Sequence, residues 1–226
     1  MLPPLRAQSF QVSVKFPPTE DVSAPSRTGG GGTRGGCLMG RLPLTPIVPS
    51  NNLVTTVSAH PTLFWYVPGS RTNTNSALFV LLDSQDNKVY QTTLALKGTP
   101  GIVKLSIPTT VSLQSAQNYK WQFSVLCNQD SEQVGGYVEG SIERTQLNSQ
   151  QKLQLAAAKD PLQQAEVYAQ ARVWQETLAI VSQLRQNRPH DSKIAEAWNE
   201  LLESVDLKAI ASAPLLDCCS ADNAQK

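Results

Sequence analysis

The stretch that decides the fold reads LQSAQNYKWQFSVLC and covers residues 113–127. In its second half Trp121, Phe123 and Val125 alternate with polar residues, which is the pattern of a β-strand with one face in a core. Tyr119 begins this alternation and follows a short polar loop. The arrangement predicts that the Tyr119 hydroxyl group bonds back to the backbone of that loop while the alternating residues enter the core.

Six more segments of this kind occur between residues 53 and 147. They are rich in β-branched and aromatic residues, and turn signals such as DSQDN and KGTPG separate them. Their sequences are LVTTVSA, TLFWYVP, ALFVLLD, KVYQTTLAL, IVKLSIP and GYVEGSIERTQL. Seven short strands over about 95 residues predict a β-sandwich at residues 53–147, and Tyr119 resembles the tyrosine corner of immunoglobulin and fibronectin type III folds. We therefore expect an immunoglobulin/fibronectin-like β-sandwich.

The apolar spacing becomes helical from residue 148 onward. Asp160 and Pro161 are the N-cap and first residue of one predicted helix, and VWQETLAIVSQLRQN and DSKIAEAWNELLESV each place apolar residues on one stripe. The spacing resembles a tetratricopeptide helix pair, with Arg172 in the turn where Gly is usual, but fewer than two repeats fit. We expect a small tetratricopeptide-like helical region at residues 148–216, docked on the sandwich, and a C-terminal tail at residues 217–226.

Residues 1–52 are rich in Pro and Gly and predict a flexible leader. Within this leader Gly30, Gly32 and Gly35 have the spacing of a dinucleotide-binding loop. Such a loop needs a strand before it and a helix after it, so that the helix N-terminus meets the pyrophosphate. Gly and Pro stand where the helix should begin. We therefore expect no nucleotide and no other cofactor.

The charges of the chain are sparse and balanced. The 19 basic and 18 acidic residues nearly cancel, so neither nucleic acid nor an anionic membrane surface is an expected partner. No apolar run approaches the roughly 18–20 residues that span a bilayer. The sequence predicts no membrane span.

The chain has four cysteines, Cys37, Cys127, Cys218 and Cys219. None of them forms a Cys-x-x-Cys pair, and only two histidines are present, so a tetrahedral zinc site is not expected. Adjacent cysteines rarely bridge each other, because the bond strains the peptide between them. We expect a disulfide between Cys37 and Cys127, with Cys218 or Cys219 as the alternative partner. Buried free thiols are the other interpretation.

The sequence contains few combinations of residues that are typical of a catalytic site. His60 precedes a proline before a predicted strand, and His190 follows a proline in a turn between predicted helices. Residues 83–87, DSQDN, begin like a calcium-binding loop, but no late Glu completes the pattern, so a hairpin turn is expected. Glu139 and Glu143 lie four apart on one strand, about 13 Å from each other, which is too far for a glycosidase pair. We expect no catalytic, cofactor-binding or metal-binding residues and no enzymatic activity.

The acidic residues of the last predicted helix have a structural explanation. Glu196, Glu200 and Glu203 recur at helical spacing opposite the apolar stripe. This spacing indicates the solvated face of an amphipathic helix.

Several distinctive stretches read GGGGTRGGCL, HPTLFWYVP, KVYQTTLALKGTPGIVKLSIP, NYKWQFSVLCN, AEVYAQARVWQETLAIVSQLR, WNELLESVDL and APLLDCC. With these stretches the chain resembles, from about residue 17 to residue 219, the mostly cyanobacterial family called domain of unknown function 928. The family has no established activity, so the resemblance implies no functional residue. It does imply export, since relatives usually begin with a signal peptide.

The N-terminus itself gives a weaker indication of export. It lacks the basic start and the apolar stretch of a signal peptide, but small residues at Ala7 and Ser9 follow LPPL in the pattern that signal peptidase reads. We expect a periplasmic or extracellular protein whose true start lies upstream. A cytoplasmic protein is the alternative.

These observations favour a non-enzymatic protein-interaction module of the cell envelope. Its partner is an unknown protein, bound through the sandwich or the helical face, and Tyr168, Arg172 and Arg185 lie near the open side of the helical hairpin. Tyr and Arg are among the residue types that dominate interface energetics. The alternatives are a saccharide-binding or small-ligand-binding module with exposed aromatic residues, and an unrecognised hydrolase with a polar pocket around one of its histidines.

Overall fold

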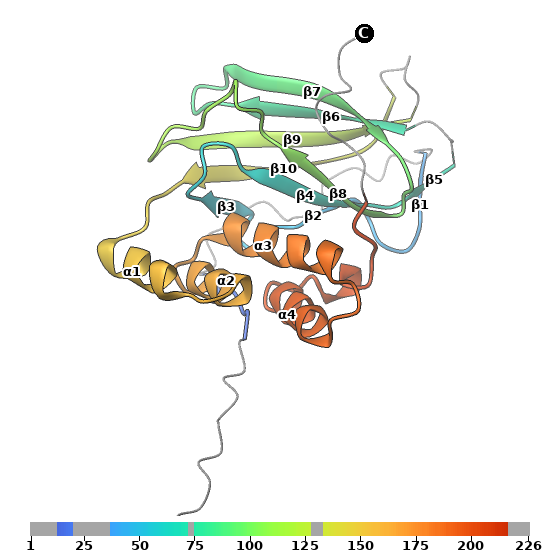
Figure 1. Ribbon diagram of the computed structural model, residues 1–226. Helices are drawn as coiled ribbons and strands as arrows, with labels where there is room; N and C mark the ends of the chain where they lie inside the picture. Colours follow the sequence, from blue (N-terminus) through green and yellow to red (C-terminus); the bar gives the residue numbers. More distant parts are fainter. Residues whose placement is uncertain (1–12, 20–36, 72–74, 128–132, 217–226) are drawn as a thin grey trace, which may run out of the picture.

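The computed structural model describes residues 13–19, 37–71, 75–127 and 133–216. Within these ranges the chain forms three β-sheets and four α-helices. Figure 1 shows the helices gathered on one side of the sheets. The fold is therefore a mixed β and α arrangement in which a β part comes first in the sequence and a helical part follows.

Two of the sheets hold most of the β structure. The larger sheet has the order β3-β10-β9-β6-β7, with β3 at Leu53–Thr56, β10 at Val134–Arg144, β9 at Asn118–Leu126, β6 at Asn75–Leu82 and β7 at Lys88–Leu96. The smaller sheet has the order β2-β4-β8, with β2 at Thr45–Pro46, β4 at Thr62–Val67 and β8 at Gly101–Ser106. Each of the seven segments that alternation predicted overlaps one of these strands, and β2 was not predicted. A two-stranded sheet joins β1, Leu38–Met39, to β5, Gly69–Ser70.

The two larger sheets face each other across one aromatic core. Trp65 of β4 stacks on Phe123 of β9, with ring centroids 4.3 Å apart, and also contacts Phe79 of β6 and Trp121 of β9. All four side chains are fully buried. The alternation along β9 thus directs its large residues toward the smaller sheet, as the sequence predicts.

Tyr119 occupies the expected position at the start of β9. It is 4% exposed, and its hydroxyl oxygen accepts a hydrogen bond of 2.9 Å from the backbone N–H of Gln114. The same hydroxyl group donates to the Gln117 side-chain oxygen at 3.2 Å. The predicted bond from Tyr119 to the preceding loop is confirmed.

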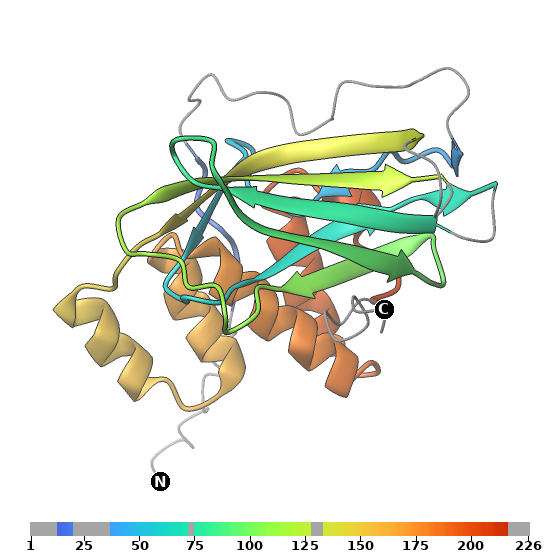
Figure 2. The same cartoon turned by 90° about the horizontal axis from the view of Figure 1, so that it is seen from above.

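The helices are α1 at Ser149–Ala157, α2 at Pro161–Gln170, α3 at Trp174–Asn187 and α4 at Ser192–Glu203. Side chains of Asn148, Asp160 and Asp191 cap the first, second and fourth of them. The central helix, α3, packs against β3 and β4, and the Trp174 indole N–H donates to the Ile47 carbonyl oxygen at 2.9 Å. Seen from above, in Figure 2, the larger sheet lies over the helices with the smaller sheet between them, so none of the four described helices covers its outer face.

The prediction of a flexible leader over residues 1–52 is wrong for the parts that the structure describes. Val14 and Phe16 are buried, as are most residues from Leu44 to Val48, and β2 pairs with β4. The physical reason is that apolar residues between the prolines cover the sheets and helices, so that the Pro-rich segments are extended and packed. The glycines at positions 30, 32 and 35 lie outside the described residues, as do Cys218, Cys219 and the predicted tail at residues 217–226.

Candidate functional site

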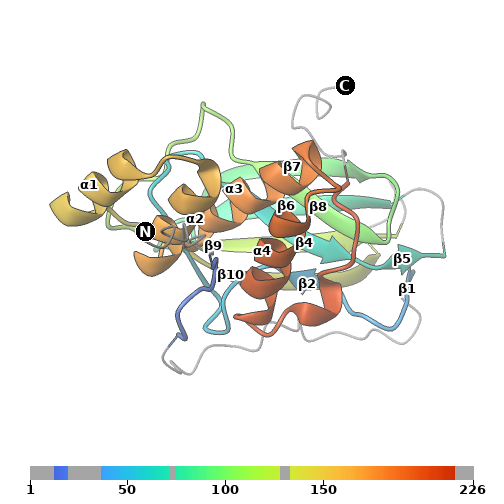
Figure 3. The same cartoon turned by 60° about the horizontal axis from the view of Figure 1, so that its bottom comes forward.

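Residues 13–19 cross the helical part of the molecule as an extended segment. Figure 3 shows this segment, in dark blue, next to α2 and α4. Val14 is 0% exposed and Phe16 is 4% exposed, whereas Lys15 between them faces solvent. The Phe16 and Trp174 rings form a T-shaped pair with a centroid distance of 5.1 Å. Alternate side chains therefore point into the protein, as they do along a β-strand.

Polar groups hold the backbone of this segment at two points. The Phe16 N–H donates to the Ser204 hydroxyl oxygen at 3.0 Å, and the Arg172 guanidinium donates to the Pro18 carbonyl oxygen at 3.0 Å. Such bonds do not depend on which side chains the bound segment carries. We call Arg172, Trp174, Glu200 and Ser204 the docking site.

Glu200 of α4 contacts side chains of the segment. It accepts a hydrogen bond of 3.0 Å from the Ser13 hydroxyl group, and its other oxygen lies 3.7 Å from the Lys15 ammonium group. The interpretation of Glu200 as part of a purely solvated face is therefore wrong, because the extended segment lies along that part of α4. The Lys15 side chain of this ion pair is 65% exposed, so the pair contributes little to the stability of the docked segment.

The backbone around Arg172 explains how its side chain is directed. Arg172 lies in the turn between α2 and α3 with a φ of 58°, the left-handed conformation that usually requires Gly. Its carbonyl oxygen accepts from the Thr55 hydroxyl group at 2.5 Å, and that hydroxyl oxygen accepts from the Trp174 N–H at 3.0 Å. Thr55 of β3 thus fixes the turn, and the exposed guanidinium reaches the segment.

Glu176, in the first turn of α3, joins the helical part to the sheets. One carboxylate oxygen accepts from the Thr56 hydroxyl group at 2.7 Å and from the backbone N–H groups of Val57 and Ser58 at 3.1 and 3.0 Å. Burial raises the pKa of Glu176, although these hydrogen bonds act in the opposite direction. Nearby Tyr168 is half-buried, and its pKa is raised by burial and by the negative charge of Glu176.

Arg185 lies near the other end of α3. Its guanidinium carbon is 4.8 Å above the Trp198 ring centroid, and one of its nitrogens donates to the Ala213 carbonyl oxygen at 3.1 Å. Arg185 lies 11 positions after Trp174, the first residue of α3, so the helical rise separates it from the turn that holds Arg172 by about 17 Å. Of the three predicted contact residues, Arg172 therefore bonds the extended segment and Tyr168 lies nearby. Arg185 lies apart from them and connects α3 with α4 and the C-terminal segment.

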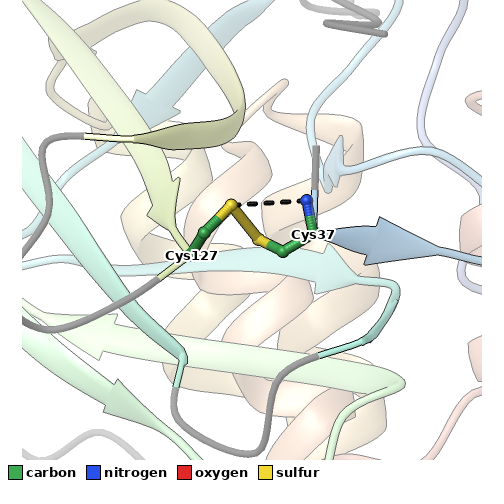
Figure 4. The surroundings of a disulfide bond; sticks show 2 residues. All are labelled: Cys37 and Cys127. Carbon is green, nitrogen blue, oxygen red and sulfur yellow. Dashed lines mark hydrogen bonds between the residues drawn. A yellow bond between two sulfur atoms is a disulfide. The ribbon is translucent and has the colours of Figure 1, made fainter. Parts of the chain in front are cut away.

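Cys37 and Cys127 are joined by a disulfide bond (Figure 4). Their Cα atoms are 5.4 Å apart, and the Cys37 N–H donates to the Cys127 sulfur at 3.3 Å. The bond links the residue before β1 to the residue after β9. Gly135 of β10 lies against it, since a Cβ atom there would be 2.7 Å from the Cys37 sulfur.

The other candidate residues have local roles. The His60 Nδ1 atom is 2.8 Å from the Val111 carbonyl oxygen, and His190 is exposed after α3. Asp83 accepts from the N–H groups of Gln85 and Asn87 in the hairpin turn that the sequence predicts. Among the described residues, no group of three or more His, Cys, Asp or Glu side chains could hold a metal ion. No described helix has the length and apolarity needed to cross a membrane.

A cleft of about 740 Å³ lies on the outer face of the larger sheet. Side chains of β9 and β10 and of nearby turns line it, among them Asn51, Ser84, Asp86, Lys120, Gln122, Glu139, Ser141 and Glu143. The Lys120 ammonium group bonds the Asp86 carboxylate at 2.7 Å. Leu53, Leu82 and Trp121 also line the cleft, so charged and polar side chains stand beside apolar ones on its walls.

Comparison with known proteins assigns the chain to a family. A family model described as Domain of Unknown Function (DUF928) matches residues 29–215. The chain belongs to the DUF928 family. The matched part of this DUF928 chain includes the disulfide, the two larger sheets and the four helices, whereas residues 13–19 precede it.

A search of curated proteins finds no match for the DUF928 chain. Among solved structures, a glycosyl hydrolase family 2 member from Bacteroides cellulosilyticus is 12% identical, with a TM-score of 0.29. The alignment covers 80% of the DUF928 chain but only 35% of that protein. A likeness at this TM-score carries no argument about fold or activity.

The sequence analysis did not identify Val14, Phe16, Glu176 or Ser204, and it interpreted Glu200 only as a solvated residue. The available signal for the first two was the alternation of Val14 and Phe16 with Ser13 and Lys15, which is typical of an extended segment with one buried face. Nothing local indicated the partners, because the contacts of the segment join residues more than 150 positions apart.

Proposed function

We propose that this DUF928 chain is an exported, non-enzymatic protein-interaction module of the cell envelope, and that its docking site binds an extended segment of a partner protein. The observation that carries the proposal is the packing of residues 13–19. Two buried apolar side chains and two backbone hydrogen bonds hold that segment. A site that accepts one extended segment in this way offers the same contacts to another.

The chemistry of the site defines the partner segment. The Trp174 ring favours an aromatic side chain, and burying one contributes about 1.5–3 kcal/mol. A small aliphatic residue two positions earlier fits the place of Val14, and Glu200 favours a hydroxyl or basic side chain beside it. Residues 13–19 belong to the same chain as the docking site, so they compete for it at an effective concentration of order mM. A partner segment must therefore bind tightly enough to displace them.

The disulfide supports export. Disulfide bonds persist in oxidising compartments and are rare in the reducing cytosol. Cell fractionation tests this part of the proposal. Recovery of the chain outside the cytosol, with Cys37 and Cys127 resistant to alkylation before reduction, is expected; a cytosolic chain with both thiols reactive contradicts it.

We also infer an immunoglobulin-like arrangement of the sheets. Tyr119 makes the bond typical of a tyrosine corner, and Trp121, two residues later, meets Trp65 of the facing sheet. In immunoglobulin domains the two cysteines of the inter-sheet disulfide occupy the positions that Trp65 and Trp121 have here. The left-handed conformation of Arg172 similarly supports a tetratricopeptide-like pair in α2 and α3, where Gly is the usual turn residue.

Capture from a native envelope extract tests the partner. The bait is the full chain with Phe16→Ala, which weakens the docking of its own segment, and the competitor is a synthetic peptide of residues 10–19. A protein retained by this bait, retained less by the wild-type chain and released by the peptide supports the proposal. Capture that the peptide leaves unchanged contradicts the docking site as the contact.

The cleft on the larger sheet favours a second candidate, a binding module for a saccharide or other small ligand with both hydroxyl groups and apolar faces. Amide, hydroxyl and carboxylate groups on its walls are suited to bind hydroxyl groups. Titration with a panel of saccharides, monitored by NMR, tests it. Shifts confined to residues such as Gln122 and Ser141 support this function, and unchanged spectra contradict it.

A further inference from the structure

Residues 88–94 of β7 form an edge of the larger sheet that no other described strand pairs with. β7 is the last strand in the sheet order, and among the described residues no hydrogen bond joins the backbone of residues 88–94 to any strand except β6. Figure 1 shows β7 along the rim of the molecule farthest from the helices. An unpaired edge presents N–H and C=O groups that can bind another strand.

The other sheet edges are short or covered. At the opposite end of the same sheet β3 has only four residues, and β2 has two. The outer edge of β8 is covered by the C-terminal segment, since the Ile102 N–H donates to the Pro214 carbonyl oxygen and the Leu216 N–H donates to the Ile102 carbonyl oxygen, both at 2.8 Å. By contrast the open stretch of β7 at residues 88–94 has seven residues.

The sequence of β7 lacks the features that protect a free edge. Residues 89–96 read VYQTTLAL and contain no charged residue, Gly or Pro. Natural edges are usually shielded by charges, prolines or a covering element. Val89 is 37% exposed, and Gln91 and Thr93 also face solvent. A strand of this composition is typical of an edge that is paired in the working protein.

We propose that the occupant of this edge is β7 of a second copy, which pairs antiparallel across a two-fold axis at Gln91. In this register Val89 lies opposite Thr93 of the other copy, and Tyr90 lies opposite Thr92. Lys88 lies opposite Leu94, so the two Lys88 side chains are about 20 Å apart. β-branched residues meet on the solvent face and two amide side chains meet at the axis, which are favourable cross-strand pairs. The two larger sheets become one continuous sheet.

Charge substitutions at the axis test this dimer by sedimentation equilibrium of the full chain. Gln91→Lys and Gln91→Glu each place two like charges opposite each other, so each variant alone should raise the dimer dissociation constant about tenfold or more. An equimolar mixture of the two variants should restore dimerisation. The matched control, Gln122→Lys, lies on the same exposed face but in the middle of the sheet and should leave the dimer unchanged.

A cross-linking experiment locates the contact. With Cys218 and Cys219 replaced by serine, Gln91→Cys should form a covalent dimer under mild oxidation, because opposite residues on paired strands lie within disulfide range. Gln122→Cys should not. A wild-type chain that is monomeric at every soluble concentration overturns the proposal. The proposal is also overturned if the Gln91 substitutions leave the dimer dissociation constant unchanged and Gln91→Cys forms no disulfide between the two copies.

Discussion

Phe16 and Trp174 form a T-shaped aromatic pair with a centroid distance of 5.1 Å and the two ring planes at 86°. These residues are 158 positions apart in the sequence, and their contact fastens the N-terminal segment to the first turn of α3. Trp174 is also bonded through its indole N–H to Ile47. One tryptophan therefore connects the extended segment, the central helix and the chain before β3.

Replacing Phe16 with alanine should lower the free energy of unfolding by about 2 kcal/mol, which is below the usual cost in a core because a terminal segment can undock by itself. Chemical denaturation measures the change. The control is Leu153→Ala in α1, where the side chain is 72% exposed and an effect within about 0.5 kcal/mol is expected. Equal effects for the two variants would contradict the packing of residues 13–19.

Tyr119→Phe should lower the free energy of unfolding by about 1–3 kcal/mol, because the Gln114 N–H loses its acceptor. Tyr137→Phe is the matched control, since Tyr137 is largely exposed on β10. Thermal unfolding of both variants checks the expectation. If the Tyr119→Phe chain is as stable as the control, the Tyr119 hydroxyl bond does not stabilise the fold.

Glu176 should make stability depend on pH. Burial raises its pKa in the folded chain above the usual 4.5, so the folded state binds the proton more tightly than the unfolded state. The stabilisation that proton binding at Glu176 gives the folded chain is fully present below pH 4.5 and is lost as pH rises through the raised pKa. Unfolding free energies measured over roughly pH 4–8 should therefore fall with pH more steeply for the wild-type chain than for Glu176→Gln. Parallel pH profiles would show that this carboxyl group titrates alike in both states.

The two arginines should behave differently. Arg185→Ala should cost about 1–3 kcal/mol, because it removes the stacking on Trp198 and the bond to Ala213. Arg172→Gly removes the bond to Pro18 but relieves the left-handed backbone by about 1 kcal/mol, so overall stability should not fall. Hydrogen exchange should nevertheless show faster exchange of the Phe16 amide in Arg172→Gly. Unchanged exchange at that amide would mean that Arg172 does not hold the segment.

The strands of the β part could be predicted because their information is local. Alternation along Trp121, Phe123 and Val125 marks a strand and its buried face without any knowledge of the partner strand. Tyr119 was predictable for the same reason, since its bond closes within five residues. The helix starts were readable from caps such as Asp160.

The docking site could not be predicted in the same way. Val14 and Phe16 stand among prolines, and whether such a segment packs depends on surfaces formed by α3 and α4 far along the chain. Glu200 has the spacing of a solvated residue, and only the arrangement in space brings the segment to it. Arg185 was predicted to contact a partner protein, because the sequence does not show that it stacks on Trp198 of the next helix.

The most direct test of the account is the binding of a fluorescent peptide of residues 10–19 to the full chain with Phe16→Ala, measured by anisotropy. The account predicts saturable binding at least about tenfold tighter than to the wild-type chain, whose own segment competes. A peptide carrying Val14→Ala and Phe16→Ala should not bind. Equal, unsaturable binding of both peptides to a folded Phe16→Ala chain would contradict the claim that the docking site recognises an extended segment.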